Sequence, residues 1–346
     1  MARMNMSEAT VAAIREEMLR DESVFLTGFG VTWYEGILGS ARGLWRQFGD
    51  DRVVEMPMTE TGYFGICAGA AMFGMRPIFD IGFAEYLPYI AQPLCADMAA
   101  VYYETAGKAR VPIVVAAKQG VAGNLSHPRG FTSWLAHVPG LKVVMASTAF
   151  DAKGLWKSAI RDNNPVVIIE PMGLYLGEAE EIPDEEYLVP IGKADIKRLG
   201  RDITIIAAGE MTQRALRAAE ALVHESIDAE VVDLRTLAPM DMDTVLESVS
   251  RTRRALIVHA DWKIGGFGAE IAASIAERAA GLLKTRIRRL APPHLPPPYA
   301  PGLESAFFPS VGDIVLLARK MVSEQQADRE ALRDGGAAAA HVAARI

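Results

Sequence analysis

The chain has few cysteines and no long apolar segment. Its 346 residues contain only Cys67 and Cys95, which form neither a CxxC pair nor another metal-ligand spacing. Their scarcity excludes a disulfide framework and a cysteine-based metal site, and it favours a reducing compartment. The most apolar stretch, residues 63–75, is shorter than the roughly 20 residues that span a bilayer. We therefore expect no membrane span.

Basic runs are also absent. The formal net charge is -7, and no stretch is rich in lysine or arginine. Binding to a phosphate backbone depends on such a basic surface, so nucleic acid is excluded as a partner. Residues 1–20 form a charged amphipathic pattern rather than the apolar centre of a signal peptide, and we expect a cytoplasmic protein.

Two nucleotide-binding signatures are missing as well. No GxxxxGK[ST] motif occurs, and the pairs Gly28/Gly30 and Gly266/Gly268 fail to complete GxGxxG before a helix. Neither a P-loop nor a dinucleotide fingerprint is therefore supported.

The sequence does contain the pattern of an α/β protein. Half of the residues are hydrophobic and 23% are charged, as in folded globular proteins. Short β-branched runs alternate with segments of helical period, which predicts mainly parallel sheets flanked by helices. The runs in the first half are residues 24–28, 76–81, 111–117, 142–147 and 166–171.

The length and one interruption of this pattern predict two domains. An acidic, proline-containing stretch, GEAEEIPDEEYLVPIGKAD, separates a first alternation of strands and helices from a second. We predict a first domain over residues 1–185, a linker over 186–200 and a second α/β domain over 201–323. Residues 324–346 are expected to form a disordered tail.

Glu60 stands out because it leads into a helix rich in glycine. It lies in a strand-to-helix connection, and Gly62, Gly65, Gly69 and Gly74 follow it. A glycine inside a helix costs about 1 kcal/mol, so their number indicates close packing against another backbone. The residues alone leave two interpretations of Glu60 open: a functional carboxylate, or a first-turn carboxylate that the helix dipole stabilises.

Longer segments of the sequence resemble one family. Thr59-Glu60-Thr61-Gly62 with GAAMFGMRPI is similar to the thiamine-binding region of the β subunits of pyruvate, branched-chain and acetoin dehydrogenases. The resemblance runs from about residue 7 to residue 322, in the family's order and spacing, through WLAHVPGLKVVMAS, DAKGLWKSAIRDNNPVVIIEP, VVDLRTLAPMDMDTVLESV, GGFGAEIAASIAE and PPPYAPGLE. It implies a thiamine-enzyme pyrimidine-binding domain followed by a transketolase C-terminal-like domain.

The resemblance also implies roles for three residues. Glu60 would hydrogen-bond the pyrimidine ring of thiamine diphosphate and favour the ring form that removes the thiazolium proton. Tyr86 falls where the family places an aromatic residue against the pyrimidine face, although core packing would explain it equally well. His127 matches the family's active-site histidine, which moves protons or holds the substrate carboxylate. Without the resemblance, His127 would be interpreted as a surface or structural histidine.

The segment AIRDNNP resembles a potassium-binding loop. By resemblance, the backbone oxygens of Ala159 and Ile160 and the side chains of Asp162 and Asn164 would surround the ion. The same residues also fit a helix C-terminus that Pro165 stops. Both interpretations stay open at the level of the sequence.

One pattern of thiamine enzymes is missing from the chain. A GDG motif followed about thirty residues later by Asn is similar to their clamp for diphosphate and magnesium, and this sequence has none. The resemblance therefore implies that an α subunit holds the diphosphate and Mg2+ in an α2β2 heterotetramer. A lipoyl acyltransferase is the implied further component.

The sequence departs from the family near these positions. Where the family has His-Ser-Gln, this chain has His127-Pro128-Arg129, and Arg129 adds a fixed positive charge suited to a carboxylate or phosphate. Phe29 stands where the family has a glutamate. We therefore predict that Arg129 contributes to substrate binding and that the choice of substrate has changed.

Three hypotheses describe the function. The leading one is the β subunit of a thiamine-diphosphate-dependent 2-oxo acid dehydrogenase, which decarboxylates a 2-oxo acid and transfers the acyl group to a lipoyl acceptor. A two-subunit carboligase or transketolase without a lipoyl acceptor is the first alternative, and Phe29 and Arg129 favour it somewhat. A non-catalytic scaffold subunit is the second, and the presence of Glu60 and His127 argues against it.

Overall fold

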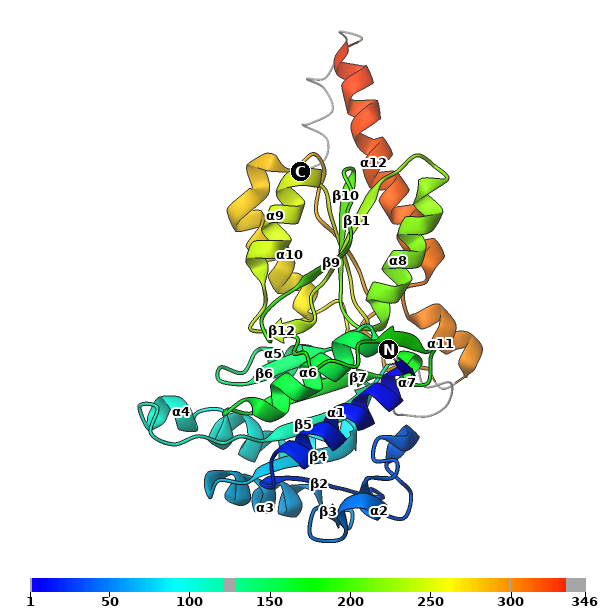
Figure 1. Cartoon of the computed structure of the whole chain (residues 1–346). Coiled ribbons are helices and arrows are strands. Elements are labelled where there is room, and N and C mark those ends of the chain that lie inside the picture. Colours follow the sequence, from blue (N-terminus) through cyan, green and yellow to red (C-terminus); the bar gives the residue numbers. More distant parts are fainter. Residues whose placement is uncertain (1, 121–128, 299, 334–346) are drawn as a thin grey trace.

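The chain folds into two α/β units, which lie one above the other in Figure 1. The computed structural model describes residues 2–120, 129–298 and 300–333. Among these residues, no helix is long and apolar enough to cross a lipid bilayer. Each unit is built on a mainly parallel sheet with helices on both faces, which confirms the predicted fold class.

The first unit holds most of the strands that the sequence predicts. Its elements in chain order are β1 (Ala2–Met4), α1 (Met6–Arg20), β2 (Val24–Gly28), η1 (Ile37–Gly39), α2 (Leu44–Phe48), β3 (Val53–Glu55), α3 (Glu60–Met72), β4 (Arg76–Phe83), η2 (Ala84–Ile90), η3 (Gln92–Met98), α4 (Val101–Glu104), β5 (Val114–Gln119), α5 (Thr132–Ala136), β6 (Lys142–Met145), α6 (Ala149–Arg161), β7 (Val166–Pro171), α7 (Met172–Tyr175) and β8 (Glu180–Ile182).

A seven-stranded sheet with buried faces forms the centre of this unit. Its order is β12-β6-β7-β5-β4-β2-β3, and all neighbouring strands are parallel except β12 (Thr236–Ala238), which runs antiparallel to β6. Alternate residues of β5 face opposite sides, as the period of two requires. Val114 and Ala116 pack in the core that α1 and α6 cover, and Val115 and Ala117 pack in the core that contains α3.

Helix α1 begins with a capping box. The side chain of Asn5 accepts a hydrogen bond from the backbone N–H of Glu8, and Glu8 accepts one in return from the backbone N–H of Asn5. This pairing satisfies donors that a helix start otherwise leaves free. The apolar side chains of Val11, Ile14 and Met18 in this helix are buried against the sheet.

The second unit repeats the architecture on a smaller scale. Its remaining elements are β9 (Asp195–Arg198), β10 (Ile203–Ala207), α8 (Glu210–Val223), β11 (Ala229–Asp233), α9 (Met242–Thr252), β13 (Ala255–Val258), α10 (Phe267–Ala279), η4 (Ala280–Leu282), β14 (Arg288–Leu290), α11 (Pro301–Phe307) and α12 (Val311–Arg333). The sheet order is β14-β13-β10-β11-β9, with only β9 antiparallel to its neighbour. Helices α8 and α12 cover one face, and α9 and α10 cover the other.

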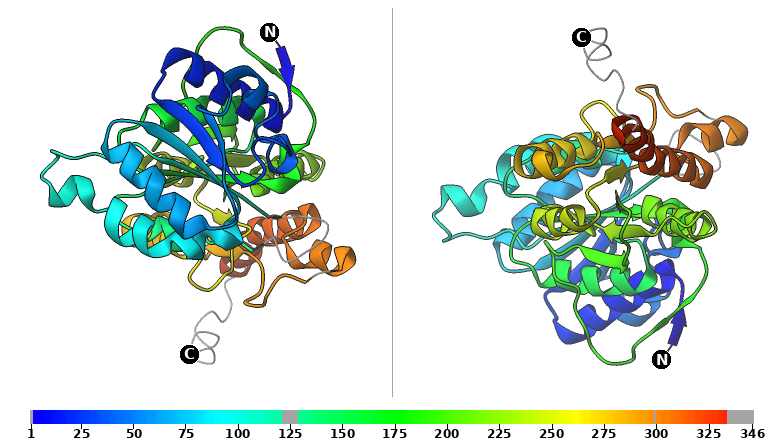
Figure 2. Two further views of the ribbon diagram at one scale, coloured as in Figure 1. Left: turned by 90° about the horizontal axis from the view of Figure 1, so that it is seen from below. Right: turned by 90° about the horizontal axis from the view of Figure 1, so that it is seen from above.

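The two units overlie one another along the long axis of the molecule (Figure 2). Strand β12 links them physically, because it follows β11 in the chain but pairs with β6 at the edge of the first sheet. Helix α12 continues to Arg333, into residues 324–346, for which a disordered tail is expected from the sequence.

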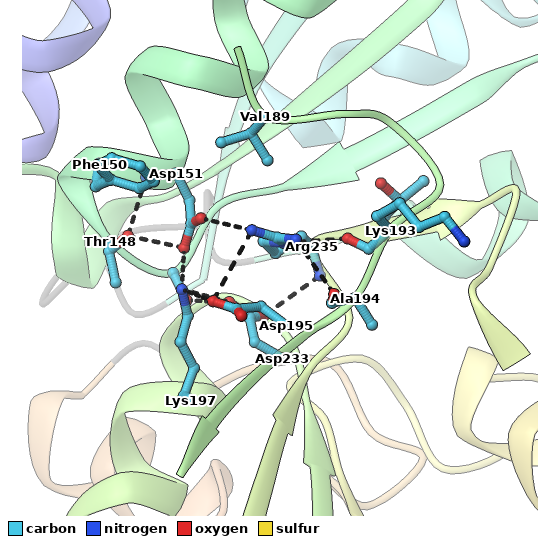
Figure 3. Close-up of polar contacts among 12 residues, drawn as sticks. Thr148, Phe150, Asp151, Val189, Lys193, Ala194, Asp195, Lys197, Asp233 and Arg235 are labelled. Atoms are coloured by element: carbon cyan, nitrogen blue, oxygen red, sulfur yellow. Dashed lines mark hydrogen bonds and ion pairs between the residues drawn. The ribbon is translucent and has the colours of Figure 1, made fainter. Parts of the chain in front are cut away.

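A buried ionic cluster lies at the junction of the units (Figure 3). Asp151, near the start of α6, pairs with Lys197 of β9 and lies 3.1 Å from Nη1 of Arg235. Asp233, at the end of β11, lies 4.0 Å from Lys197 and accepts a hydrogen bond from Ser147. Breaking a buried ion pair leaves an uncompensated charge, so the cluster resists separation of the two units.

Asp233 should make the stability depend on pH. Burial and the neighbouring Asp151 raise the pKa of Asp233 to about 7, against the opposing effect of Lys197. The folded protein then binds this proton more tightly than the unfolded chain does. The free energy of unfolding should therefore fall, by at most about 1.4 kcal/mol per pH unit, as the pH rises from the ordinary aspartate pKa towards 7. We expect Asp233→Asn to flatten this part of a stability profile measured by urea unfolding, and an unchanged slope would assign it to another group.

Candidate active site

The carboxyl ends of β3, β2, β4 and β5 lie at one edge of the first sheet, because these strands are parallel neighbours. Open α/β sheets bind ligands at this edge. The connection after β3 leads to Glu60, the segment after β4 carries Tyr86, and Arg129 follows β5. The fold thus brings three of the predicted site residues to the same edge.

Glu60 is the first residue of α3, directly after the N-cap Thr59. Its side chain is partly buried, and within the described part of the chain its carboxylate forms no hydrogen bond or ion pair. The N-terminal end of a helix favours a negative charge there. A carboxylate at the start of this helix that forms no ion pair or hydrogen bond with the described residues is available to a ligand.

Tyr86 lies next to the start of α3, in the 3-10 helix η2. Its ring is stacked with that of Tyr89, with centroids 6.2 Å apart. The hydroxyl of Thr61 donates a 2.6 Å hydrogen bond to the backbone oxygen of Tyr89, which ties α3 to η2. Burial raises the pKa of Tyr86, and the charges of Glu85 and Glu60 add to this effect. The helices that carry Glu60 and Tyr86 are thus joined next to both residues.

The outer face of α3 is open. A Cβ placed on Gly65 or Gly69 would meet no atom within 4 Å, other than the helix's own nearby backbone. Ile66 is 64% exposed and Phe73, directly after the helix, is 94% exposed. A helix that combines bare glycines with exposed apolar side chains has the surface expected for close packing against another chain.

The loop after β5 carries the other two predicted site residues. Arg129 is exposed, and His127 lies outside the described residues. Three residues beyond Arg129, the hydroxyl of Thr132 donates a 2.7 Å hydrogen bond to the side-chain oxygen of Gln119, the last residue of β5. This bond holds the far end of the loop at the carboxyl edge of the sheet.

The loop after β2 contains Phe29, which stands where the resembling family has a glutamate. Phe29 is in edge contact with Trp33, with ring centroids 5.9 Å apart. The carboxylate of Glu55 accepts hydrogen bonds from the backbone N–H of Gly30 at 2.5 Å and of Thr32 at 3.0 Å. The backbone of this loop is therefore hydrogen-bonded to a carboxylate on β3.

The expected potassium loop begins in the last turn of α6 and is held by Arg76. Nη1 of Arg76 donates to the backbone oxygens of Ile160 and Asp162, both at 2.9 Å. The backbone oxygen of Ala159 accepts from the N–H of Asp162 at 3.2 Å. All four predicted residues thus take part in hydrogen bonds, because the backbone N–H of Asn164 also donates to Asp162 at 2.9 Å.

One oxygen of this turn has no partner. The side-chain oxygen of Asn164 is buried and accepts no hydrogen bond within the described part of the chain. The carboxylate of Asp162, by contrast, pairs with Lys142. An orphaned buried oxygen calls for a donor, a water molecule or a cation.

A buried charge cluster beneath the site was not predicted from the sequence. Lys118 of β5 is fully buried, with its ammonium nitrogen 3.4 Å from Asp80 and 3.0 Å from Glu170. It also lies 5.3 Å from the centre of the Tyr175 ring. The signal in the sequence is a charged residue inside each of three apolar runs, RPIFDI, VVAAKQ and VVIIEP.

The described residues offer no group of three or more His, Cys, Asp or Glu side chains that could hold a metal ion. The candidate site in this chain combines the carboxylate of Glu60, the ring of Tyr86, the exposed Arg129 and the open face of α3.

Two family profiles together match most of the chain. "Transketolase, pyrimidine binding domain" matches residues 2–177, and "Transketolase, C-terminal domain" matches residues 192–314. A solved split-gene transketolase, described as an inactive β4 tetramer, superposes with a TM-score of 0.74 at 20% identity, covering 93% of this chain and 99% of its own. At that identity the superposition shows the shared fold alone.

Curated relatives cover nearly the whole chain. The β subunit of acetoin:2,6-dichlorophenolindophenol oxidoreductase of Cupriavidus necator is 40% identical over 89% of this chain and 94% of its own length. The 2-oxoisovalerate dehydrogenase subunit beta of Bacillus subtilis is 41% identical over 89% and 95%, respectively. The mitochondrial pyruvate dehydrogenase E1 component subunit beta of Mus musculus is 40% identical over 92% and 91%.

Proposed function

We infer the function from the family to which this chain belongs, the β subunits of thiamine-dependent 2-oxo acid dehydrogenases, with their transketolase pyrimidine-binding and C-terminal domains. The chain supplies the pyrimidine-binding half of an active site that decarboxylates a 2-oxo acid and transfers the acyl group to a lipoyl acceptor. Residues 1–185 are proposed as the pyrimidine-binding domain, 186–200 as the linker and 201–323 as the C-terminal domain.

The observation that carries this proposal is the common location of Glu60 and Tyr86. A partly buried carboxylate without a partner among the described residues begins α3, and the aromatic ring lies in η2, which a hydrogen bond joins to the start of α3. A ring nitrogen that shares a proton needs the carboxylate, and the flat face of a pyrimidine suits the aromatic ring. The residues present therefore fit the pyrimidine half of thiamine diphosphate.

Thiamine diphosphate supplies a carbanion nucleophile once its thiazolium proton is removed. In this chain, Glu60 would hold a proton at the pyrimidine ring nitrogen, and Tyr86 would fix the plane of the ring. His127 would move protons near the reacting carbon, and Arg129 would bind the substrate carboxylate. The charge of a guanidinium does not change at neutral pH, so Arg129 is suited to binding rather than proton transfer.

Replacing Tyr86 by alanine should weaken cofactor binding. Aromatic stacking contributes about 0.5–1.5 kcal/mol beyond burial, so we expect the Kd for thiamine diphosphate to rise by about tenfold or less. Tyr86→Phe is the matched control, because it keeps the ring and should bind almost as the wild type does. Equal Kd values for the alanine and wild-type complexes, measured by calorimetry, would remove Tyr86 from the site.

The other half of the site is proposed to come from an α subunit. The chain has no GDG motif followed by Asn, and the described residues hold no metal-binding cluster. We therefore assign the diphosphate and Mg2+ to the α subunit, and we assign the open face of α3 to a subunit contact in an α2β2 assembly. The bare Gly65 and Gly69 allow the close approach that such a contact needs.

A potassium ion is proposed beside Asn164, whose buried oxygen has no described partner. The carbonyl oxygens of Ala159 and Ile160 and the side chain of Asp162 would complete the site, and Ile160 would share its oxygen with Arg76, since a carbonyl oxygen has two lone pairs. Replacing Na+ by K+ at equal ionic strength should raise the unfolding midpoint, and a ligand at 100 times its Kd stabilises by about 2.7 kcal/mol. The rise in the unfolding midpoint on changing from Na+ to K+ should be absent in Asn164→Ala. Identical midpoints in both salts would exclude the site.

The experiment that tests the function is reconstitution with an α subunit that carries GDG and Asn. Release of CO2 from 2-oxo acids, together with acylation of a lipoyl domain, is expected for the complex and not for either chain alone. Decarboxylation followed by carbon–carbon bond formation, with no lipoyl acylation, would favour the carboligase alternative. A complex that assembles but binds no thiamine diphosphate would replace both enzymes with the scaffold hypothesis.

A further inference from the structure

A pocket lies on the face of the first sheet opposite α3, away from the candidate active site. It opens between α1 and the loop that precedes α2, and its volume is about 440 Å³. Small-molecule sites typically measure about 300–1,000 Å³. Helix α1 packs in the core that covers this face, while α3 packs in the core on the other side. The pocket is therefore separated from Glu60 by the sheet.

Three arginines line this pocket: Arg3, Arg15 and Arg42. Arg15 donates to the side-chain oxygen of Gln47 at 3.0 Å, and Arg3 donates to the backbone oxygen of Ala179 at 3.0 Å. Both acceptors are neutral. Within the described residues, none of the three guanidinium groups forms an ion pair with a carboxylate, although Glu181 lies opposite Arg3 in the pairing of β1 with β8.

The loop conformation leaves room for two of these guanidinium groups. Gly39 and Gly43 both have positive φ, 79° and 73°. A Cβ on Gly39 would lie 2.9 Å from Nη2 of Arg42, and a Cβ on Gly43 would lie 3.8 Å from Nη2 of Arg15. The bare glycines thus leave room for both side chains at the pocket wall. Leu38, directly before Gly39, has a positive φ of 57°, a conformation that costs free energy in a branched residue.

The charge balance of the pocket favours a dianion. Glu8 is the one acid among the lining residues, and its carboxylate accepts the capping hydrogen bond from Asn5 at 2.9 Å. Three positive groups against one negative group leave an excess of two positive charges. The remaining wall includes the apolar side chains of Met4, Val11 and Ala12.

We propose that this pocket binds a phosphate monoester of a small organic molecule, with Arg3, Arg15 and Arg42 around the phosphate and the organic part against α1. A phosphate monoester carries about -1.5 to -2 charges at pH 7, which matches the excess. Guanidinium groups bind phosphate through parallel, charge-assisted hydrogen bonds. This inference does not depend on the proposed catalytic function.

The test is calorimetric titration of the full chain alone with inorganic phosphate and with phenyl phosphate, in a chloride buffer. Using the chain alone leaves out the diphosphate site proposed for the α subunit. We expect saturable binding of both probes at one site, with phenyl phosphate tighter because of the apolar wall. The double variant Arg15→Gln/Arg42→Gln should bind at least about tenfold more weakly, as expected for the loss of charge-assisted hydrogen bonds.

Arg46→Gln is the matched control. Its side chain is 80% exposed, lies in the neighbouring helix α2 and does not line the pocket, so its phosphate binding should equal that of the wild type. Equal thermal unfolding midpoints would show that the double variant is folded. The proposal is overturned if the wild type shows no saturable phosphate binding, if the double variant binds as well as the wild type, or if succinate binds as tightly as phosphate.

Discussion

Replacing Glu60 by glutamine is expected to lower the turnover of the reconstituted complex by about two to four orders of magnitude, the range of general acid–base catalysis. Glutamine keeps the size and the hydrogen-bonding capacity of the side chain but cannot hold the proton at the pyrimidine ring. Thiamine diphosphate should therefore still bind, since the α subunit holds its diphosphate. The expected signature is a large loss in kcat, with a Kd for the cofactor that changes much less.

The matched control is Glu104→Gln, a change of an exposed acid in α4, which should leave turnover unchanged. Exchange of the thiazolium proton with deuterium, followed by NMR, measures the step that Glu60 would promote. Slow exchange in Glu60→Gln would support the role, and wild-type exchange in that variant would show that Glu60 is only a first-turn carboxylate of α3.

The strands of the first sheet could be predicted because burial on both faces demands continuous apolar runs. The runs at residues 24–28 and 166–171 coincide with β2 and β7, and the run at 111–117 overlaps β5. The offset at β5 arises where Lys118 and Gln119 extend the strand beyond its apolar residues. A prediction from the apolar pattern ends the strand before the charged Lys118, although β5 is still paired with β4 and β7 at that residue.

The junction of the two units could not be predicted in the same way. Strand β12 is three residues long and joins a sheet whose other strands lie far earlier in the chain. The pairing of β1 with β8 is equally short and remote. Such strands carry too few residues for a period, and only the tertiary fold selects their partners.

The site shows a similar division. The position of Glu60 at the start of a glycine-rich helix followed from residue spacing, but its role rests on resemblance to a family. The hydrogen bond that ties Thr61 to the backbone of Tyr89 depends on how η2 returns to α3. No spacing in the sequence specifies how η2 packs against the start of α3, so the common location of Tyr86 and Glu60 is known only from the structure.

Lys118→Met is expected to destabilise the protein by about 3–5 kcal/mol, the cost of breaking a buried ion pair. Methionine fills a similar volume, so the loss should come from charge rather than from a cavity. Burial alone would lower the pKa of Lys118, but Asp80 and Glu170 raise it above its ordinary value, which keeps the lysine charged. Without it, two carboxylates that are at least 95% buried lose their common cation. Urea unfolding measures this loss directly.

The pH dependence of the variant separates this cause from simple misfolding. Burial raises the pKa of Glu170, and Lys118 opposes that rise. Removing the lysine should therefore make the folded protein take up a proton, so the stability lost relative to wild type should be smaller near about pH 5 than near about pH 8. Adding Glu170→Gln to Lys118→Met should recover part of the loss, because one uncompensated charge is gone. A loss that is equal at both pH values and unchanged in the double variant would mean that packing, not charge, makes Lys118 necessary beneath the site.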